Sequence, residues 1–222
     1  MIGVHKDFQD RVDEINYYFI FVQKIEKGET VLTQSNSIDL AYNHQERENL
    51  LRTFKASAFL LLYNLMESTL TNAVEAIFDE LNNKSTSFDS CRKEIRRVIL
   101  SNLKECNIDK IIPDINSLAI DIVTKTFRKE NLVSGNVDAR KIKDFAIEYG
   151  FAPPSADGRD LLTVKSNRND LAHGSKSFAE VGRDYTMEEI IGIKQKVIDY
   201  LNAMLISVTT YISQQHYLSV QS

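Results

Sequence analysis

The sequence contains few residues that interrupt regular structure. Its 8 glycines and 3 prolines are about 5% of the 222 residues, where an average protein has roughly 12%. This scarcity disfavours a disordered chain, a collagen-like chain and a β-sandwich with many tight turns. With 43% hydrophobic and 26% charged residues, the composition is that of a globular protein, and we expect residues 1–222 to form a single domain.

Cysteines and long apolar runs are scarce as well. Cys91 and Cys106 form no CxxC pair, so neither a disulfide framework nor a zinc site is indicated, and we expect two buried thiols. The longest uninterrupted apolar stretch, residues 58–63, is far below the roughly 18 residues of a membrane span. The first ten residues also lack the apolar core of a signal peptide. We therefore expect a cytoplasmic protein with no membrane partner.

Positive charge is not in excess either, since 27 basic and 31 acidic residues give a net charge of −4. Proteins that bind nucleic acid through bulk charge are basic, so a polyanion would have to meet a local patch. The best candidate is the segment CRKEIRR, in which Arg92, Lys93, Arg96 and Arg97 outweigh Glu94. The alternative is an ordinary solvated helix face.

Apolar residues recur at spacings of three and four along most of the chain, which predicts amphipathic helices. No segment alternates with period two, so the sequence predicts an all-α bundle with long antiparallel helices. A loop is expected over residues 30–36, a kink or break near 45–50, and two or three short helices between 114 and 150. The clearest helices are 8–22, 41–81, 88–106, 138–149, 157–172 and 186–215. Residues 84–155 are expected to form a small helical lobe inserted into the bundle.

Three helix boundaries carry specific signals. Thr186 and Glu189 have the spacing of a capping box at the start of the last helix. Gly150 and Gly174 each follow an apolar helical pattern, where a glycine commonly takes the left-handed conformation that ends a helix.

Most enzyme signatures are missing. The histidines at positions 5, 44, 173 and 216 have no HxxxH or HExxH spacing, so no metal site is predicted. The sequence also lacks GxGxxG, GxxxxGK[ST] and GxSxG, so no nucleotide cofactor and no serine-hydrolase nucleophile are expected.

Polar and ionisable residues concentrate instead at residues 165–174, where an otherwise apolar-faced helix ends. Asn169 and His173 are four apart and share a helix face, whereas Arg168 and His173 lie about 140° apart around a regular helix. The long Arg168 side chain, or a symmetric dimer interface, could still bring the two groups together. A histidine before a terminating glycine is also a plain helix ending, because an imidazole is favourable at the negative end of the helix dipole.

The string RNDLAHG resembles the signature of HEPN-domain proteins. In that signature an Arg is followed by a polar residue and, four to six positions after the Arg, by a His; here these are Arg168, Asn169 and His173. The resemblance extends to FLLLYNLMESTLTNAVEAIFDELN, SGNVDARKIKDFAIEYGF and YTMEEI, and it covers nearly all of the chain from about Tyr42 onward. These segments look like those of a prokaryotic family of HEPN-like nucleases.

The resemblance implies an all-α homodimer in which two Arg–His motifs form one composite cleft that cleaves RNA without a metal. The 2′-OH would attack the phosphate and leave a 2′,3′-cyclic phosphate. His173 of the two protomers would serve as base and acid, and Arg168 would hold the phosphate. Asn169 would orient the imidazole or donate to the phosphate. Glu67 is a candidate partner for Arg168 or His173, or else a solvent-facing helix residue.

The implied function is a metal-independent endoribonuclease acting as a toxin or antiviral defence effector, controlled by a separate antitoxin or sensor protein. The alternative is a non-catalytic HEPN module for dimerisation or for docking a partner protein. A third hypothesis, a helical ligand-binding protein, predicts a closed apolar pocket and a monomer.

Overall fold

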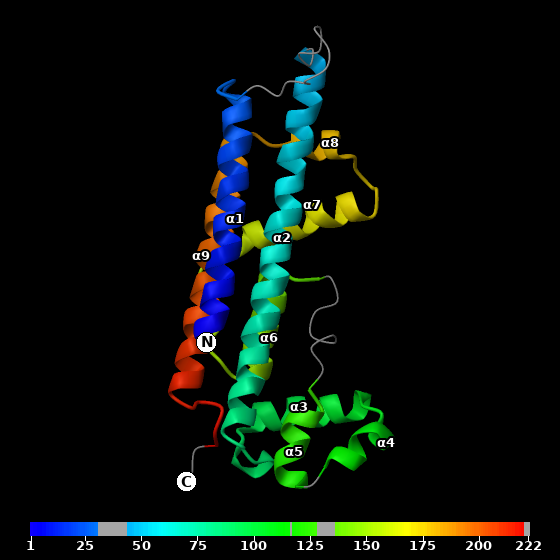
Figure 1. Ribbon diagram of the computed structural model, residues 1–222, viewed down its shortest axis with the longest axis vertical. Coiled ribbons are helices and arrows are strands. Elements are labelled where there is room, and N and C mark those ends of the chain that lie inside the picture. The colour runs from blue at the N-terminus through cyan, green and yellow to red at the C-terminus, as the bar shows by residue number, and fades with distance from the viewer. Residues whose placement is uncertain (31–43, 116, 128–135, 220–222) are drawn as a thin grey trace. The chain divides into compact units, whose positions relative to one another are not determined.

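The computed structural model describes residues 1–30, 44–115, 117–127 and 136–219, and within these ranges every regular element is a helix (Figure 1). This confirms the predicted all-α class. One isolated antiparallel bridge joins Cys91 and Leu218. The elements are α1 (Ile2–Glu26), α2 (His44–Asn83), η1 (Phe88–Ser90), α3 (Lys93–Glu105), α4 (Ile108–Ile111), η2 (Ile112–Asp114), α5 (Leu118–Lys125), α6 (Ala139–Tyr149), α7 (Arg159–Ala172), α8 (Phe178–Arg183) and α9 (Met187–Ser213).

One predicted helix is wrong. Residues 88–106 do not form one helix, because Cys91 and Arg92 are extended between η1 and α3, and the Arg92 amide donates to the Tyr217 carbonyl at 2.8 Å. α2 runs as one helix from His44 onward, so the chain does not break near residues 45–50, and a kink there stays a prediction. The predicted loop at 30–36 lies, apart from its first residue, outside the described residues, as do residues 41–43 and 128–135.

The chain forms two compact units. The first contains Met1–His5, Glu67–Asp157 and Tyr200–Ser222, and the second contains Lys6–Met66 and Gly158–Asp199. Both α2 and α9 therefore contribute residues to each unit. The lobe predicted over residues 84–155 lies within the first unit, and its status as a separate insertion stays a prediction.

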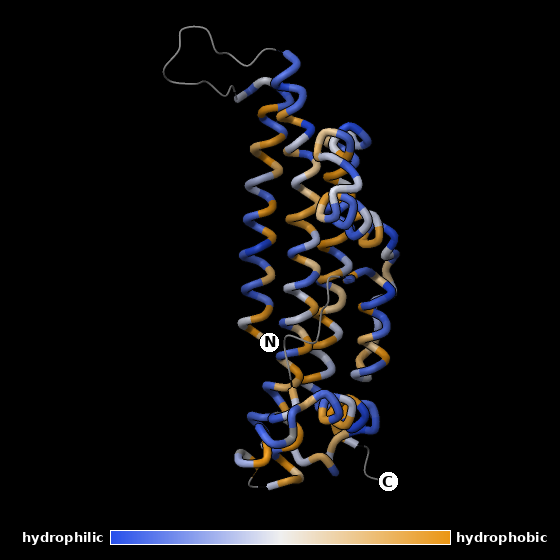
Figure 2. The backbone as a smooth tube through the Cα atoms, turned by 90° about the vertical axis from the view of Figure 1, so that its right-hand side faces the viewer, coloured by the Kyte–Doolittle hydropathy of each residue, from blue (hydrophilic) through white to orange (hydrophobic). Residues whose placement is uncertain are grey.

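The core of the second unit is built from the apolar faces of α1, α2, α7 and α9. Hydrophobic positions recur along the long helices (Figure 2), and those of α1 are buried at spacings of three and four. Two hydrogen bonds fix α1 and α2 as antiparallel neighbours: Arg11 donates to Asn64, and the Tyr18 hydroxyl donates to the Phe54 carbonyl. The largest fully buried side chains of this unit are Phe19, Phe59, Leu62, Tyr63, Leu65 and Met66.

In the first unit, α3 packs against α6, and the end of α6 is hydrogen-bonded to the last turns of α9. Gly150 ends α6 with a φ of 83°, as the sequence predicts, and its amide donates to Ala146. The Tyr211 hydroxyl donates to the Tyr149 carbonyl at 2.7 Å. A well-defined polar contact thus anchors α9 beside the α6 terminus.

The two thiols differ in burial. Cys91 is buried, as expected, whereas Cys106 is only partly buried. Burial raises the pKa of the Cys91 thiol to about 11, although the neighbouring Arg96 charge acts in the opposite direction. At pH 8 its thiolate fraction should therefore be about 100-fold below that of an unperturbed cysteine.

We expect Cys91 to react with iodoacetamide at least 100-fold more slowly than free cysteine in native protein and at an ordinary rate in urea. Peptide mass spectrometry over a time course measures this rate. Rapid labelling of native Cys91 would contradict its buried position.

Candidate functional site

The candidate motif lies on α7, in the second unit (Figure 1). The apolar side chains Leu161, Val164 and Leu171 are buried and hold one face of the helix against the core. Near the other end of α7, Asp160 forms an ion pair with Lys196 of α9 at 3.2 Å. The motif residues therefore stand on a helix that is fixed along its length.

The end of α7 is a complete Schellman motif. Gly174 has a φ of 69°, its amide donates to Leu171, and the Ser175 amide donates to Asp170 at 2.9 Å. His173 is the C-cap residue, and its amide donates to Asn169. The His173 side chain is exposed, and no hydrogen bond joins its imidazole to any residue of the described chain. The helix ending thus presents a free imidazole to solvent.

Arg168 is half-buried and held on two sides. Its guanidinium carbon lies 4.5 Å from the centre of the Tyr63 ring, and its Nη1 donates to Asn169 Oδ1 at 3.1 Å. Tyr63 is only 2% exposed, so the ring is a fixed surface beneath the cation. A guanidinium stacked on an aromatic face retains its in-plane donors, which leaves them available to an anion.

Asn167 is a polar residue of the same helix that our sequence analysis missed. It is 5% exposed, and its Nδ2 donates to the Thr163 carbonyl and to the Tyr185 hydroxyl, both at 2.9 Å. The Tyr185 ring lies 4.9 Å from that of Phe59. Asn167 lies three residues after Val164 and four before Leu171, which places it on the apolar face of α7. This spacing could have identified it, because a polar residue on a buried face is the informative exception.

The segment that follows the motif is also ordered by side-chain contacts. Ser177 and Glu180 form a capping box at the start of α8, a helix that the sequence analysis did not predict. Lys176 lies 3.7 Å from Asp170 and 3.5 Å from Asp184. Lys176 forms ion pairs with these two carboxylates, so this lysine stabilises the turn after α7.

The structure brings two of the predicted site residues into contact. Arg168 and Asn169 are joined by a hydrogen bond, and His173 lies one turn further along α7. No hydrogen bond connects the His173 imidazole to Arg168 or Asn169 within the described residues. Glu67 is half-buried on α2 and belongs to the first unit, so its partnership with Arg168 or His173 stays a prediction.

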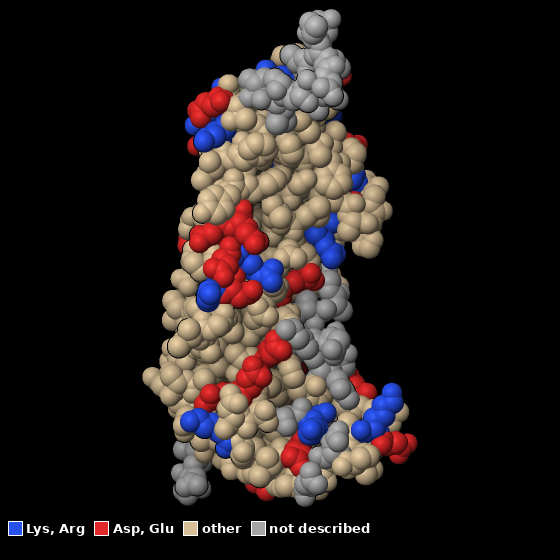
Figure 3. Space-filling model, in the orientation of Figure 1, with Lys and Arg blue, Asp and Glu red and all other residues tan. Residues whose placement is uncertain are grey.

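The surface charges match the sequence composition. Basic and acidic side chains are interspersed on the face that Figure 3 displays, in keeping with a net charge of −4. Among the described residues, no three His, Cys, Asp or Glu side chains gather where they could hold a metal ion. None of the helices in the described ranges combines the length and hydropathy that a bilayer span requires.

Comparison with protein-family models finds a match that covers most of the chain. The model of the family described as MAE_28990-like HEPN aligns with residues 4–217, which include all of α7 and the turn after it. Neither the curated proteins nor the solved structures contain a significant match.

Proposed function

Because the chain belongs to the MAE_28990-like HEPN family, we propose that it is a metal-independent endoribonuclease with Arg168, Asn169 and His173 in its active site. The observation that supports this most is that a half-buried Arg168, held against the Tyr63 ring, and an exposed His173 lie at the same end of one helix. A helix ending without a function has no need to fix a guanidinium on a buried tyrosine.

The proposed reaction needs three kinds of group. A base takes the proton of the ribose 2′-OH as its oxygen attacks the phosphorus, and an acid protonates the departing 5′-oxygen. A cation neutralises the charge that builds on the phosphorane oxygens. Histidine suits both proton transfers near neutral pH, and the forked Arg168 suits the phosphate. The products are a 2′,3′-cyclic phosphate and a free 5′-hydroxyl.

Each protomer contributes one His173, whereas the reaction needs both a base and an acid. The proposed site is therefore completed by a second copy of the chain. In a symmetric dimer, two exposed His173 side chains face one cleft, where one acts as base and the other as acid. Asn169 Oδ1 accepts a hydrogen bond from Arg168 Nη1 and thereby holds the guanidinium in place. Its amide nitrogen is then the group that would reach the phosphate or the imidazole.

We further propose a cytoplasmic toxin or antiviral effector, restrained by an antitoxin or sensor protein. A ribonuclease that cuts cellular RNA requires such control.

Replacing His173 by alanine should reduce RNA cleavage by about 1,000-fold, within the range for loss of a general acid or base. The measurement incubates wild type and variant with mixed RNA in EDTA and analyses product ends for a 2′,3′-cyclic phosphate. His44→Ala is the matched control, because His44 is an exposed histidine in the same unit. DNA should resist wild type, since it lacks the attacking hydroxyl.

The same assay tests the alternative function. If wild type and His173→Ala were equally inactive on RNA, with candidate activators added, the non-catalytic docking module would be the better explanation. Equal activity of the two proteins would instead place the catalytic group elsewhere.

A further inference from the structure

The basic segment at the start of α3 is not used by the proposed active site. Residues 92–97 contain four basic side chains and one acidic side chain, a local charge of +3 in a chain of net charge −4. These residues belong to the first unit, whereas the motif belongs to the second. The segment therefore needs an explanation of its own.

Three of the basic residues line a cavity of about 620 Å³. One wall is the first turn of α3, and the other is the segment that follows α9. Backbone hydrogen bonds from Arg92 to Tyr217 and from Ser219 to Ser90 hold the two walls together. The lining residues are Arg92, Lys93, Glu94, Arg96, Gln214, Gln215, His216, Leu218 and Ser219.

Arg92 forms part of the cavity wall, but its Nε and Nη1 donors are already bound to other groups of the protein. Its Nε donates to Glu94 at 2.7 Å, and its Nη1 donates to the carbonyls of Gly150 and His216. Burial opposes ionisation of Glu94, but the hydrogen bond and charge of Arg92 outweigh it and lower the pKa of Glu94. Any Cβ at position 150 would lie 2.7 Å from the guanidinium, so the glycine leaves room for Arg92. Arg92 and Glu94 thus neutralise each other.

Arg96 and Lys93 keep their charges available. Arg96 uses only Nε, which donates to the Cys91 carbonyl at 2.6 Å, and its two terminal nitrogens have no hydrogen bond to the described chain. The Lys93 side chain is 77% exposed, and its Nζ lies 3.9 Å from Glu94 Oε1, a long distance for an ion pair. The exposed amides of Gln214 and Gln215 add uncharged donors from the opposite wall.

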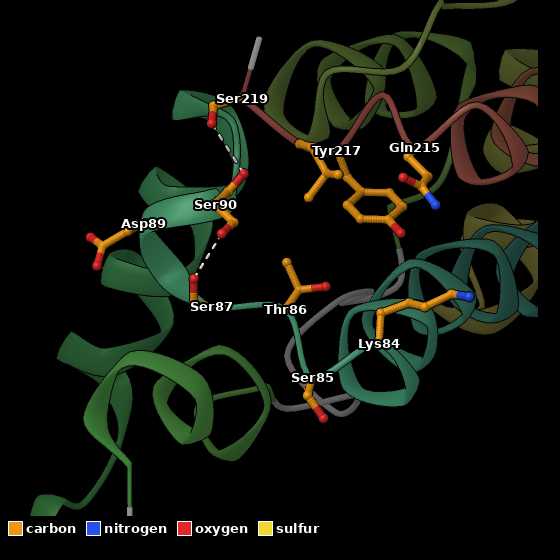
Figure 4. Close-up of a pocket in the computed structure, with 10 residues that line it drawn as sticks. Lys84, Ser85, Thr86, Ser87, Asp89, Ser90, Gln215, Tyr217 and Ser219 are labelled. Atoms are coloured by element: carbon orange, nitrogen blue, oxygen red, sulfur yellow. Dashed lines mark hydrogen bonds between the residues drawn. The ribbon is translucent and has the colours of Figure 1, made fainter. Parts of the chain in front are cut away.

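A second cavity, of about 720 Å³, adjoins the first and shares Gln215, Leu218 and Ser219 with it. Figure 4 shows hydroxyl groups around it, with Ser90 hydrogen-bonded to both Ser87 and Ser219. Hydroxyls and a lysine, here Lys84, are typical contacts for a nucleic-acid backbone. The two cavities together form a polar track. Apart from the paired Arg92 and Glu94, its charged lining residues are Lys84, Lys93, Arg96 and the acidic Asp89.

We propose that this track binds the phosphodiester backbone of RNA, with Lys93 and Arg96 as the principal phosphate contacts. The identity of the polyanion rests on the proposed ribonuclease function. Two permanent charges with open donors bind phosphate without reading bases, so the contact strengthens RNA binding with no sequence preference.

The test measures binding in a His173→Ala background, so that no RNA is cut. Fluorescence anisotropy with a labelled single-stranded RNA compares Lys93→Gln/Arg96→Gln with Lys104→Gln/Lys125→Gln. The second pair removes equal charge from exposed positions of the same unit outside both cavities. We expect the first pair to weaken binding about 10-fold near 0.1 M salt and the control pair less than about 2-fold.

The salt dependence gives a second readout. Each lost phosphate contact should reduce the slope of log K against log salt by about 0.7, so the first pair should reduce it by roughly 1.4. Lys93→Arg/Arg96→Lys keeps both charges and should preserve the slope, which separates lost charge from lost folding. The proposal would be overturned if the two glutamine pairs lost RNA affinity equally. It would also be overturned if the charge-preserving pair showed the reduced salt slope.

Two further outcomes distinguish the ligand and the function. If inorganic phosphate bound the cavity in titrations while the glutamine pair kept full RNA affinity, the site would take free phosphate and the RNA proposal would be wrong. If the cavity variants lost RNA binding while wild type cleaved no RNA, the track would stand and the nuclease proposal would fail.

Discussion

Replacing Arg168 by lysine should lower kcat/KM for RNA cleavage by about 100-fold, even though the positive charge remains. The guanidinium carbon lies 4.5 Å from the centre of the Tyr63 ring, and Nη1 is hydrogen-bonded to Asn169. A lysine ammonium has neither the planar face nor the forked donors, so it cannot reproduce both contacts while holding a phosphate. Steady-state kinetics on a defined RNA, with kcat and KM measured separately, provide the test.

Tyr63 supplies the matched variants. Tyr63→Phe keeps the ring beneath Arg168, so we expect kcat within about 3-fold of wild type. Tyr63→Leu removes the ring, and a cation–π contact of about 0.5–2 kcal/mol corresponds to a loss of roughly 2- to 30-fold. We expect that loss mainly in kcat, because Arg168 would be misplaced in the transition state. Equal kinetics for Phe and Leu would contradict a role for the ring.

An independent readout does not require activity. The Arg168 side-chain protons should show an upfield ring-current shift in wild type and in Tyr63→Phe, and lose it in Tyr63→Leu. If the shift persisted in the leucine variant, the guanidinium would not be stacked on Tyr63. This measurement therefore separates the geometry of Arg168 from its proposed chemistry.

The sequence predicts the ends of α6 and α7 well because each is encoded locally. A glycine after an apolar helical pattern suffices for Gly150 and Gly174, and both take positive φ values. The capping box at Thr186 and Glu189 is likewise confirmed by reciprocal hydrogen bonds. The Ser177–Glu180 box carries the same signal, but the six residues of α8 contain too few apolar positions for periodicity to identify a helix.

Contacts between distant residues are not encoded in this way. The break before α3 depends on pairing with Leu218, and the support of Arg168 depends on Tyr63, over a hundred residues earlier in the chain. Tyr63 lies in the mostly apolar segment FLLLYNL, where the sequence alone does not distinguish a tyrosine from any other core residue. The motif letters therefore predict which residues to test, whereas the surroundings of Arg168 follow only from the packing of α2 against α7.

The packing of α8 explains why position 182 must be glycine. Gly182 is buried, and a Cβ there would collide with the backbone of Arg52 on α2, with the Arg52 Cα only 2.7 Å away. Backbone atoms inside a helix cannot turn aside as a side-chain end can. Lys55 donates to the Tyr185 carbonyl at 2.8 Å just beyond, so α8 and the chain after it are held closely on α2.

Gly182→Ala should lower the free energy of unfolding by about 1–3 kcal/mol, because α8 must move away from α2 to admit the methyl group. Gly192→Ala is the matched control, since Gly192 lies within α9 in the same unit with open space around it. In an open helix position, alanine should raise the free energy of unfolding by about 0.5–1 kcal/mol. Urea denaturation followed by circular dichroism measures both changes. Opposite signs would confirm that α8 is in contact with the α2 backbone, whereas stabilisation by both substitutions would contradict it.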